Sequence, residues 1–535
     1  MLIKRLTLTL ILGVCTLTAS LAQDSLLLRD YAFVRRSDPW LNGSNAAALT
    51  RFAHGNIAAA ELSLTKGKGG FTDYYDAPDA LLADAGVESY CRLSSRAVVY
   101  GAMSYNNFTG RDMAGSAFIP GRHLPFDIVE DSLTNTGTKH RDTYRLSGGV
   151  GYSVAGGIAI GARLDYNAAN YAKYKDLRHK NKLMDMMLSA GLYLPLGTAV
   201  QIGANYLYRR TTESLQFSTY GKNDRTYMSF INYGPYIGTV EQFGSNGYTD
   251  KSRAMPLVDD INGIAAQIGA QLSAFSLYNA FTYMRRQGYY GRRSPYTITY
   301  TNHRSHIYDY AASLAMQMPT AMVRLDLSLH AENLENDARN YSEQKNDAGA
   351  TYYQYYTPVK VADRLWADGA AAITADLGIS DMLPSWTLQA GLRWEHRKQT
   401  AYLYPYYRRQ RLTSREPFVS ISHNRVSAHG VWTFAADAAF RKGDGAPYED
   451  NTFAEPSDKA TPPPTMDAYM MREYLWLTAS QYCVGGSVKY SVPLPQLKMK
   501  AYVKGSATHR KCNATDNYLT GRDRTTVSIA VGCEH

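Results

Sequence analysis

The sequence lacks a long apolar run after its first 22 residues, where no stretch reaches the about 18 residues of a membrane-spanning helix. It is also poor in cysteine. Beyond residue 22 only four cysteines remain, without the close spacing of a metal or redox motif: Cys91, Cys483, Cys512 and Cys533. These absences argue against a helical membrane anchor and a cysteine-based metal centre. We expect the cysteines to act as small apolar side chains, with at most one incidental disulfide.

The first 22 residues have the features of a secretory signal. Lys4-Arg5 precedes an apolar stretch over residues 6–17, and residues 20–22 form a small-x-small cleavage site. Lipidation at Cys15 is the alternative, but Val14 occupies a position where lipoprotein signals have a small residue. We expect cleavage after residue 22 and export. The full chain has 57 basic and 47 acidic residues, so losing the two basic residues of the signal lowers the net charge from +10 to +8.

From residue 53 onward, apolar and polar side chains alternate along the chain. In one such stretch Ile160 and Leu164 alternate with Arg163 and Asp165, and the pattern recurs up to residues 526–534. A period of two places successive side chains on opposite faces of a strand. No helical layer is predicted that could cover so many apolar faces, so we expect them to face lipid. The 43 tyrosines, against 15 phenylalanines, suit the lipid–water girdles of a membrane barrel.

The predicted fold is all-β, a transmembrane antiparallel up-and-down β-barrel of about 18 strands, with 16 as the alternative because residues 411–431 are ambiguous. Short turns alternate with long polar connections at 106–142, 168–183, 211–260, 286–306, 332–364, 399–415, 442–470 and 509–520. Short periplasmic turns and long extracellular loops are typical of the outer membrane. We therefore expect a signal peptide over 1–22, a periplasmic or lumen-packed extension over 23–52, and an outer-membrane barrel over 53–535.

Charged side chains on the polar faces of these strands are the predicted lining of the lumen. A water-filled lumen lets such charges lie inside the barrel without partners, whereas a soluble core would require one for each. The predicted lumen-lining residues are Arg163, Asp165, Arg209, Arg324, Asp326, Arg393 and Glu395.

Basic residues and tyrosines are concentrated in the predicted loops. A positive mouth can select anions or bind lipopolysaccharide phosphates, and exposed aromatic rings can stack on ligands. The alternatives are that the cations only solvate the loops and that the tyrosines anchor tall strands at the interface. The candidate ligand-binding residues are Lys173, Arg178, Arg292, Arg293, Tyr353, Tyr355, Arg408 and Arg409.

The sequence contains no recognisable catalytic or metal-binding signature. His303 and His306 lie three apart, which places them on opposite faces of a strand. His123, Asp127 and Glu130 share one loop, a grouping that arises by chance in polar loops. We therefore expect no enzyme activity, no metal, no cofactor and no nucleic-acid partner.

Four segments of the sequence are distinctive: Asp38–Ala47 (DPWLNGSNAA), Tyr100–Met113 (YGAMSYNNFTGRDM), Pro125–Glu130 (PFDIVE) and Lys175–Met187 (KDLRHKNKLMDMM). They resemble an uncharacterised family of outer-membrane β-barrel proteins from Gram-negative anaerobes. The resemblance covers essentially the whole chain and implies an outer-membrane barrel, but it implies no defined activity or site. Some members lie beside transporters energised through the inner membrane, which suggests nutrient or metal uptake with a co-encoded transporter as partner.

Two functions follow from these patterns. The first is a porin-like channel for solutes with a mild anion preference, set by the basic loops. The second is a closed barrel that acts as a surface receptor or as an accessory to an energised outer-membrane nutrient or metal transporter. In both cases the expected partners are outer-membrane lipid, lipopolysaccharide and the outer-membrane assembly machinery. A soluble secreted β-protein is the third alternative.

Overall fold

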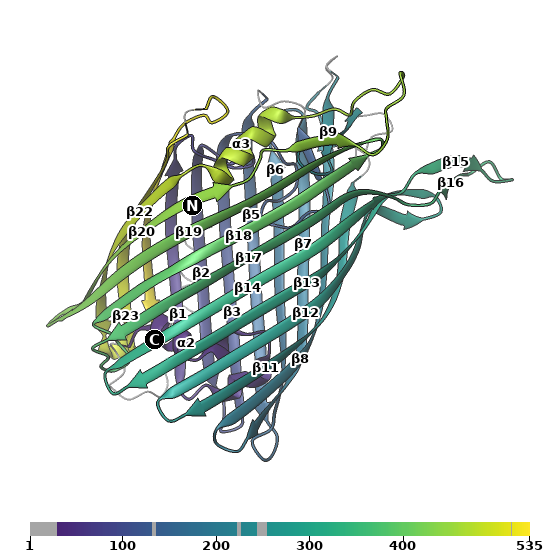
Figure 1. Cartoon of the computed structure of the whole chain (residues 1–535). Helices are drawn as coiled ribbons and strands as arrows, with labels where there is room; N and C mark the ends of the chain where they lie inside the picture. Colours follow the sequence, from purple (N-terminus) through teal and green to yellow (C-terminus); the bar gives the residue numbers. More distant parts are fainter. Residues whose placement is uncertain (1–28, 131–134, 222–225, 243–253, 515) are drawn as a thin grey trace.

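The computed structural model describes residues 29–130, 135–221, 226–242, 254–514 and 516–535. The signal peptide expected over residues 1–22 lies outside the described residues. Eighteen antiparallel strands, each paired with its neighbours in the chain, form a barrel that closes where β1 pairs with β24 (Figure 1). The all-β barrel fold and the strand number of about 18 are thereby confirmed. Closure leaves no strand edge unpaired in lipid, which is the condition for a sheet to span a membrane.

The strands alternate direction around the barrel. The barrel strands are β1 (Asn56–Lys68), β2 (Asp79–Arg92), β3 (Ala97–Met113), β5 (Gly137–Ser153), β6 (Ala159–Lys173), β7 (Arg178–Leu196), β8 (Val200–Ser218), β11 (Met255–Leu272), β12 (Phe275–Ser294), β13 (Thr297–Met318), β14 (Ala321–Ala338), β17 (Val359–Leu377), β18 (Trp386–Leu403), β19 (Tyr406–Ser427), β20 (Gly430–Asp444), β22 (Gln481–Leu494), β23 (Met499–Cys512) and β24 (Asp523–Glu534). The smaller elements are α2 (Tyr31–Ser37), η2 (Pro39–Asn42), η3 (Ala46–Arg51), β4 (Asp127–Glu130), β9 (Met228–Asn232), β10 (Gly238–Gln242), β15 (Tyr341–Lys345), β16 (Thr351–Tyr355), β21 (Glu449–Thr452), α3 (Asp467–Thr478) and η4 (Pro495–Leu497). Among the described helices none is long and apolar enough to cross a membrane.

Several connections predicted as long loops are strands instead. Residues 168–183 belong mostly to β6 and β7, which stay paired as far as Ala172 and Lys180. Residues 286–306 and 399–415 are likewise strand around tight turns, and the ambiguous 411–431 lies largely in β19. Beyond the membrane the outward face of a strand is polar as well, so the alternation that identifies a strand is lost while backbone pairing continues.

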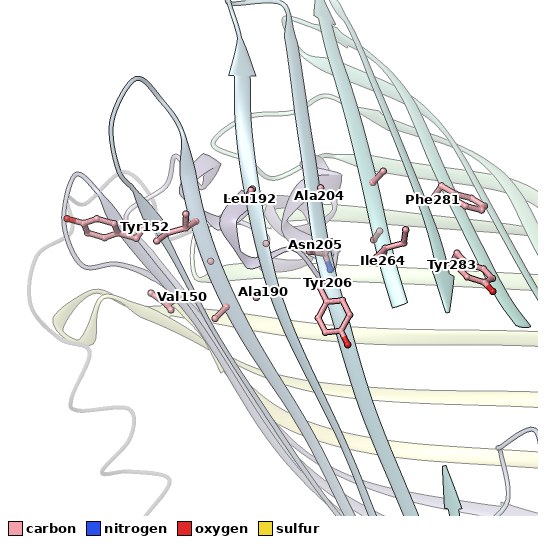
Figure 2. Close-up of a pocket in the computed structure, with 16 residues that line it drawn as sticks. Val150, Tyr152, Ala190, Leu192, Ala204, Asn205, Tyr206, Ile264, Phe281 and Tyr283 are labelled. Atoms are coloured by element: carbon pink, nitrogen blue, oxygen red, sulfur yellow. The ribbon is translucent and has the colours of Figure 1, made fainter. Parts of the chain in front are cut away.

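The outward face of the barrel is apolar. Leu192 and Ile264 are 56% and 64% exposed, and both point away from the lumen. A hollow of about 910 Å³ crosses this face from β5 to β12, where small alanines lie between larger side chains such as Tyr206 and Phe281 (Figure 2). A soluble protein rarely exposes so large an apolar surface. The protein is therefore located in the outer membrane, with its apolar face toward lipid.

Residues 29–52 pack inside the barrel, at the end that carries the short turns. The side chain of Asn45 accepts a hydrogen bond from the Ala47 backbone and so caps η3. Its amide also donates to the Leu192 carbonyl oxygen (2.8 Å) and to Gln267 Oε1 (3.0 Å). Trp40 lies edge-on to the rings of Tyr193 and Tyr278, at centroid distances of 5.3 and 5.0 Å. The barrel wall therefore holds this segment through both polar and aromatic contacts.

Inward-facing glycines of β5 to β8 make room for this segment. A methyl group at Gly161 would overlap the backbone of Ala47, and one at Gly191 would overlap the Asn45 side chain. These glycines lie on the inward faces of their strands and leave space inside the barrel. In the structure η3 occupies that space.

The opposite mouth of the barrel is filled by two inward-folded loops, which we call the plug: residues 114–130 after β3 and residues 226–242 before β11. Strand β9 pairs with both β4 and β10, so one small sheet joins the two loops. Phe118, Phe126 and Ile231 of the plug are buried against wall residues Leu257 and Tyr290. Helix α3 lies at the same mouth (Figure 1). By the usual sorting of loop lengths this is the extracellular end.

Candidate functional site: the cavity beneath the plug

A cavity of about 310 Å³ lies between the plug and the barrel wall. The plug contributes residues 119–124, Asp127 and Asn232, and the wall contributes charged side chains of β17 and β18. The large apolar residues of the plug loops pack against the wall and hold the loops there. The polar residues of the same loops line the cavity that remains between loop and wall. The cavity is thus polar, although an apolar core surrounds it.

Asp127 and Asp73 are two buried carboxylates that line this cavity. The Oδ2 atom of Asp127 accepts a hydrogen bond from the Tyr74 hydroxyl (2.8 Å) and its Oδ1 accepts one from Ser116 Oγ (2.6 Å). Burial raises the pKa of Asp127 to about 6, because the charged form loses its hydration. Burial also raises the pKa of Asp73, with the charge of Glu473 as the next cause. Asp127 and Asp73 therefore keep a proton at higher pH than an exposed aspartate does.

Arginines of the barrel wall bind the plug and α3. Arg364 of β17 donates to the Leu124 carbonyl oxygen of the plug (3.1 Å). Arg397 of β18 forms a two-pronged ion pair with Glu473 of α3, with both N–O distances at 2.9 Å. Charge-assisted bonds of this kind are stronger and more directional than neutral ones. The plug and α3 are therefore attached to the wall at several points.

A second set of wall charges lies on β11 to β14. Arg286 bonds Asp259 Oδ1 (2.7 Å) and Glu332 Oε1 (3.1 Å), and it also donates to the His123 carbonyl oxygen of the plug (2.8 Å). The buried His303 bonds the same Asp259 oxygen (2.6 Å). This network extends the attachment of the plug to a further part of the wall.

The predicted lumen-lining residues all form ion pairs. These are Arg163 with Asp165, Arg209 with Asp185, Arg324 with Asp326, Arg393 with Glu416 and Glu395 with Arg441. Two of them also contact the N-terminal segment: Arg163 donates to the Gly43 carbonyl oxygen (3.2 Å) and Arg324 to that of Arg36 (2.6 Å). The sequence argument required no partners for these charges. Their partners are charged residues on the same or a nearby strand, and the Arg393 side chain is still 54% exposed.

Two of the candidate ligand-binding cations are buried. Lys173 donates to the Asn135 carbonyl oxygen (2.8 Å), and Arg408 pairs with Asp450 and Asp467 at 2.6 and 2.8 Å. Arg178, which pairs with Asp176, and Arg409, whose guanidinium lies over the Tyr407 ring, are only partly covered. These four residues belong to two separate parts of the mouth, β6–β7 and β19.

The other four candidates gather at one place. Arg292 and Arg293 end β12 and are exposed, and Arg293 lies 4.1 Å over the Tyr289 ring. The β15–β16 hairpin reaches the same turn, since the Tyr353 backbone donates to the Pro295 carbonyl oxygen (3.0 Å). The Tyr355 hydroxyl accepts from the Thr299 backbone (2.8 Å). The hairpin itself projects away from the barrel (Figure 1).

The sequence reasoning missed the plug. It treated His123 and Asp127 as a chance grouping in a polar loop, whereas both line the cavity. The available signal was the apolar content of the same loops, such as Phe118, Phe126 and Ile231. Loops that carry several large apolar residues fold onto a protein surface rather than into water.

Comparisons with known proteins place the chain in a family. Residues 46–535 match the model of a family of unknown function (DUF6850), and the chain belongs to this family. A search of curated protein sequences finds no match.

Solved outer-membrane proteins are similar to the chain in outline only. The ferric preacinetobactin receptor BauA from Acinetobacter baumannii is 9% identical, with 90% of this chain and 80% of that chain covered and a TM-score of 0.39. The outer membrane transporter YddB from Escherichia coli is 8% identical, with 90% and 81% covered and a TM-score of 0.38. CdiB from Acinetobacter baumannii is 10% identical, with 89% and 60% covered and a TM-score of 0.33.

Proposed function

We propose that this outer-membrane barrel is closed and serves as a surface receptor, or as an accessory to an energised outer-membrane nutrient or metal transporter. The observation that supports this choice is the apolar core that the plug shares with the barrel wall, which includes Phe118, Ile231 and Leu257. A loop that merely narrowed an aqueous channel would present polar side chains to it. The porin-like channel expected first from the sequence would require the plug and residues 29–52 to leave the lumen.

The exposed group around the β12–β13 turn is the ligand-contacting surface of this proposal. Arg292 and Arg293 offer cationic groups, and Tyr353 and Tyr355 on the neighbouring hairpin offer aromatic rings. Ligand phosphates or carboxylates would pair with the cations, and sugars or partner side chains would stack on the rings. We assign Lys173 and Arg408 to holding the loops, because both are buried against other parts of the mouth.

The proposal also names partners. Outer-membrane lipid and lipopolysaccharide would surround the apolar face, and the outer-membrane assembly machinery would insert the barrel. A co-encoded transporter would bind the long loops. A trimming test of this contact is confined to residues 339–358. The range 332–364 includes the ends of β14 and β17, and the range 211–260 includes both barrel strands and the plug loop 226–242.

Liposome swelling tests whether the barrel is closed. An opened variant lacks residues 29–52 and carries glycine and serine in place of 115–129 and 226–242, so that both loops of the plug are removed. A matched control instead replaces the hairpin 341–355 with a short turn. We expect vesicles with the native protein or the hairpin control to exclude a pentose, and vesicles with the opened variant to swell. Heat-modifiable migration on gels verifies that each barrel is folded. Equal swelling with native protein and opened variant would contradict the proposal.

A further inference from the structure

His123, His330 and Glu332 lie together where the plug meets the wall. We propose that these three side chains bind a divalent transition-metal ion and so join the plug to the barrel. Each of them offers one ligand atom, and the three atoms lie within 4.8 Å of one another. His330 and Glu332 are two residues apart on β14, which puts both on its inward face. His123 comes from the plug, more than 200 positions away in the chain.

The ligand types suit a metal of intermediate hardness. Imidazole nitrogens favour ions such as Zn²⁺, Ni²⁺ and Cu²⁺, and a carboxylate oxygen completes many such sites. Three protein ligands leave at least one coordination position for water or another group. Hard ions such as Ca²⁺ require more oxygen ligands than these three residues supply.

The neighbouring side chains orient the two imidazoles. His330 Nδ1 is 2.6 Å from Asp309 Oδ1, so that its Nε2 remains for a metal. A carboxylate behind a histidine is the usual arrangement around metal-ligating imidazoles. The His123 ring stacks flat on Trp366, with the centroids 4.2 Å apart and the planes inclined by 1°. Both rings are therefore held in place by residues that are not themselves ligands.

The charges around the cluster favour a cation. Three carboxylates act on His330, those of Asp309, Asp368 and Glu332. Arg286 is an opposing charge, but it bonds Glu332 Oε1 and leaves Oε2 directed to His123 at 2.8 Å. His123 also lines the 310 Å³ cavity beneath the plug, so an ion can reach the site from that cavity.

Without a metal ion, a hydrogen bond between His123 and Glu332 still joins the plug to the barrel wall. Zinc titration distinguishes a metal site from this simpler role. The probe is Zn²⁺ competed against a chromogenic chelator, on the full-length mature protein without an affinity tag. We expect one equivalent of Zn²⁺, and at least about 10-fold weaker binding in His330→Gln and in Glu332→Gln. Asp309→Asn should weaken binding by about 10- to 100-fold, because it removes the carboxylate charge behind His330 that raises the basicity of the ligating imidazole.

The matched control is His306→Gln. His306 is exposed on β13 and bonds only Tyr283 at 2.8 Å, so this variant should bind Zn²⁺ like the native protein. Because a variant at the wall could fail to fold, X-ray absorption of the Zn²⁺-bound native protein provides a second measurement, with two imidazole ligands expected. Native protein that binds no Zn²⁺ would overturn the inference. Binding that survives both His330→Gln and Glu332→Gln, or a spectrum without imidazole ligands, would do the same.

This site does not depend on the proposed receptor role. A barrel that excludes solutes but binds no Zn²⁺ would overturn only the metal site. A barrel that conducts and still binds Zn²⁺ at these residues would overturn only the closed state.

Discussion

Asp127 shows how a single buried residue can make the plug sensitive to pH. Its carboxyl is enclosed by Tyr74 and Ser116, and burial raises its pKa to about 6, above the ordinary value of 3.8. A raised pKa means that the docked plug takes up a proton. The resulting stabilisation is complete below about pH 4 and is lost as the pH rises through 6. The buried Asp73 shifts in the same direction.

We therefore expect residues 114–130 to be better protected from hydrogen exchange at pH 5 than at pH 7, after correction for intrinsic rates. The difference should be on the order of 1–3 kcal/mol, since each pKa unit is worth about 1.4 kcal/mol. Asp127→Asn should weaken this dependence, because the amide does not titrate. Asp347→Asn, in the exposed turn of the hairpin, is the control and should behave like the native protein. An unchanged pH dependence in Asp127→Asn would show that other groups control the plug.

At the residue scale the sequence predicted the inward face of the strands but not the partners of the charges on it. Alternation alone places Arg163 and Arg324 inside the barrel. It contains no information about Gly43 or Arg36, whose carbonyl oxygens these side chains bind. Such contacts join positions far apart in the chain. They depend on how the N-terminal segment folds.

At the scale of elements, the glycines of β5 to β8 and the short helices of residues 29–52 fit one another. Gly161→Val should displace η3, because even a methyl group there overlaps the Ala47 backbone. Overpacking of this kind costs about 1–3 kcal/mol. The measurement is hydrogen exchange of residues 46–51, which should become faster while the barrel strands stay protected.

Gly148→Val is the matched control for that substitution. Gly148 lies on the outward face of β5, three residues from the Gly151 that pairs with Gly161, and a methyl group there would meet no atom within 4 Å. Protection of η3 should therefore be unchanged in this variant. Equal loss of protection in both variants would mean that the glycines serve the strands rather than the docking of η3.

The elements that the sequence could predict are those whose alternation persists. Strands such as β6 and β14 follow directly from their apolar outward faces. The tall ends of β12, β13 and β19 could not be predicted, because beyond the membrane their outward faces turn polar and the regular apolar–polar alternation is lost. Helix α3 and the plug were missed for a different reason. Their positions depend on contacts between apolar residues far apart in the chain, such as Phe118 with Tyr290, which local alternation does not show.

At the scale of the whole molecule, the closed barrel encloses protein at both ends. Residues 29–52 pack against β6 and β7 at the end with short turns, and the plug packs against β11, β12 and β17 at the other. The strand count, the sorting of loops and the location in the outer membrane could be read from the sequence. Whether the lumen is open could not be read, because it depends on where irregular segments fold.

Single-channel conductance of the purified native protein in a planar bilayer tests the closed barrel most directly. We expect bilayers that contain folded protein, identified by heat-modifiable migration, to show no stable conductance steps at neutral pH. Stable steps, with a reversal potential in a salt gradient that indicates anion preference, would contradict the closed barrel and favour the porin-like channel.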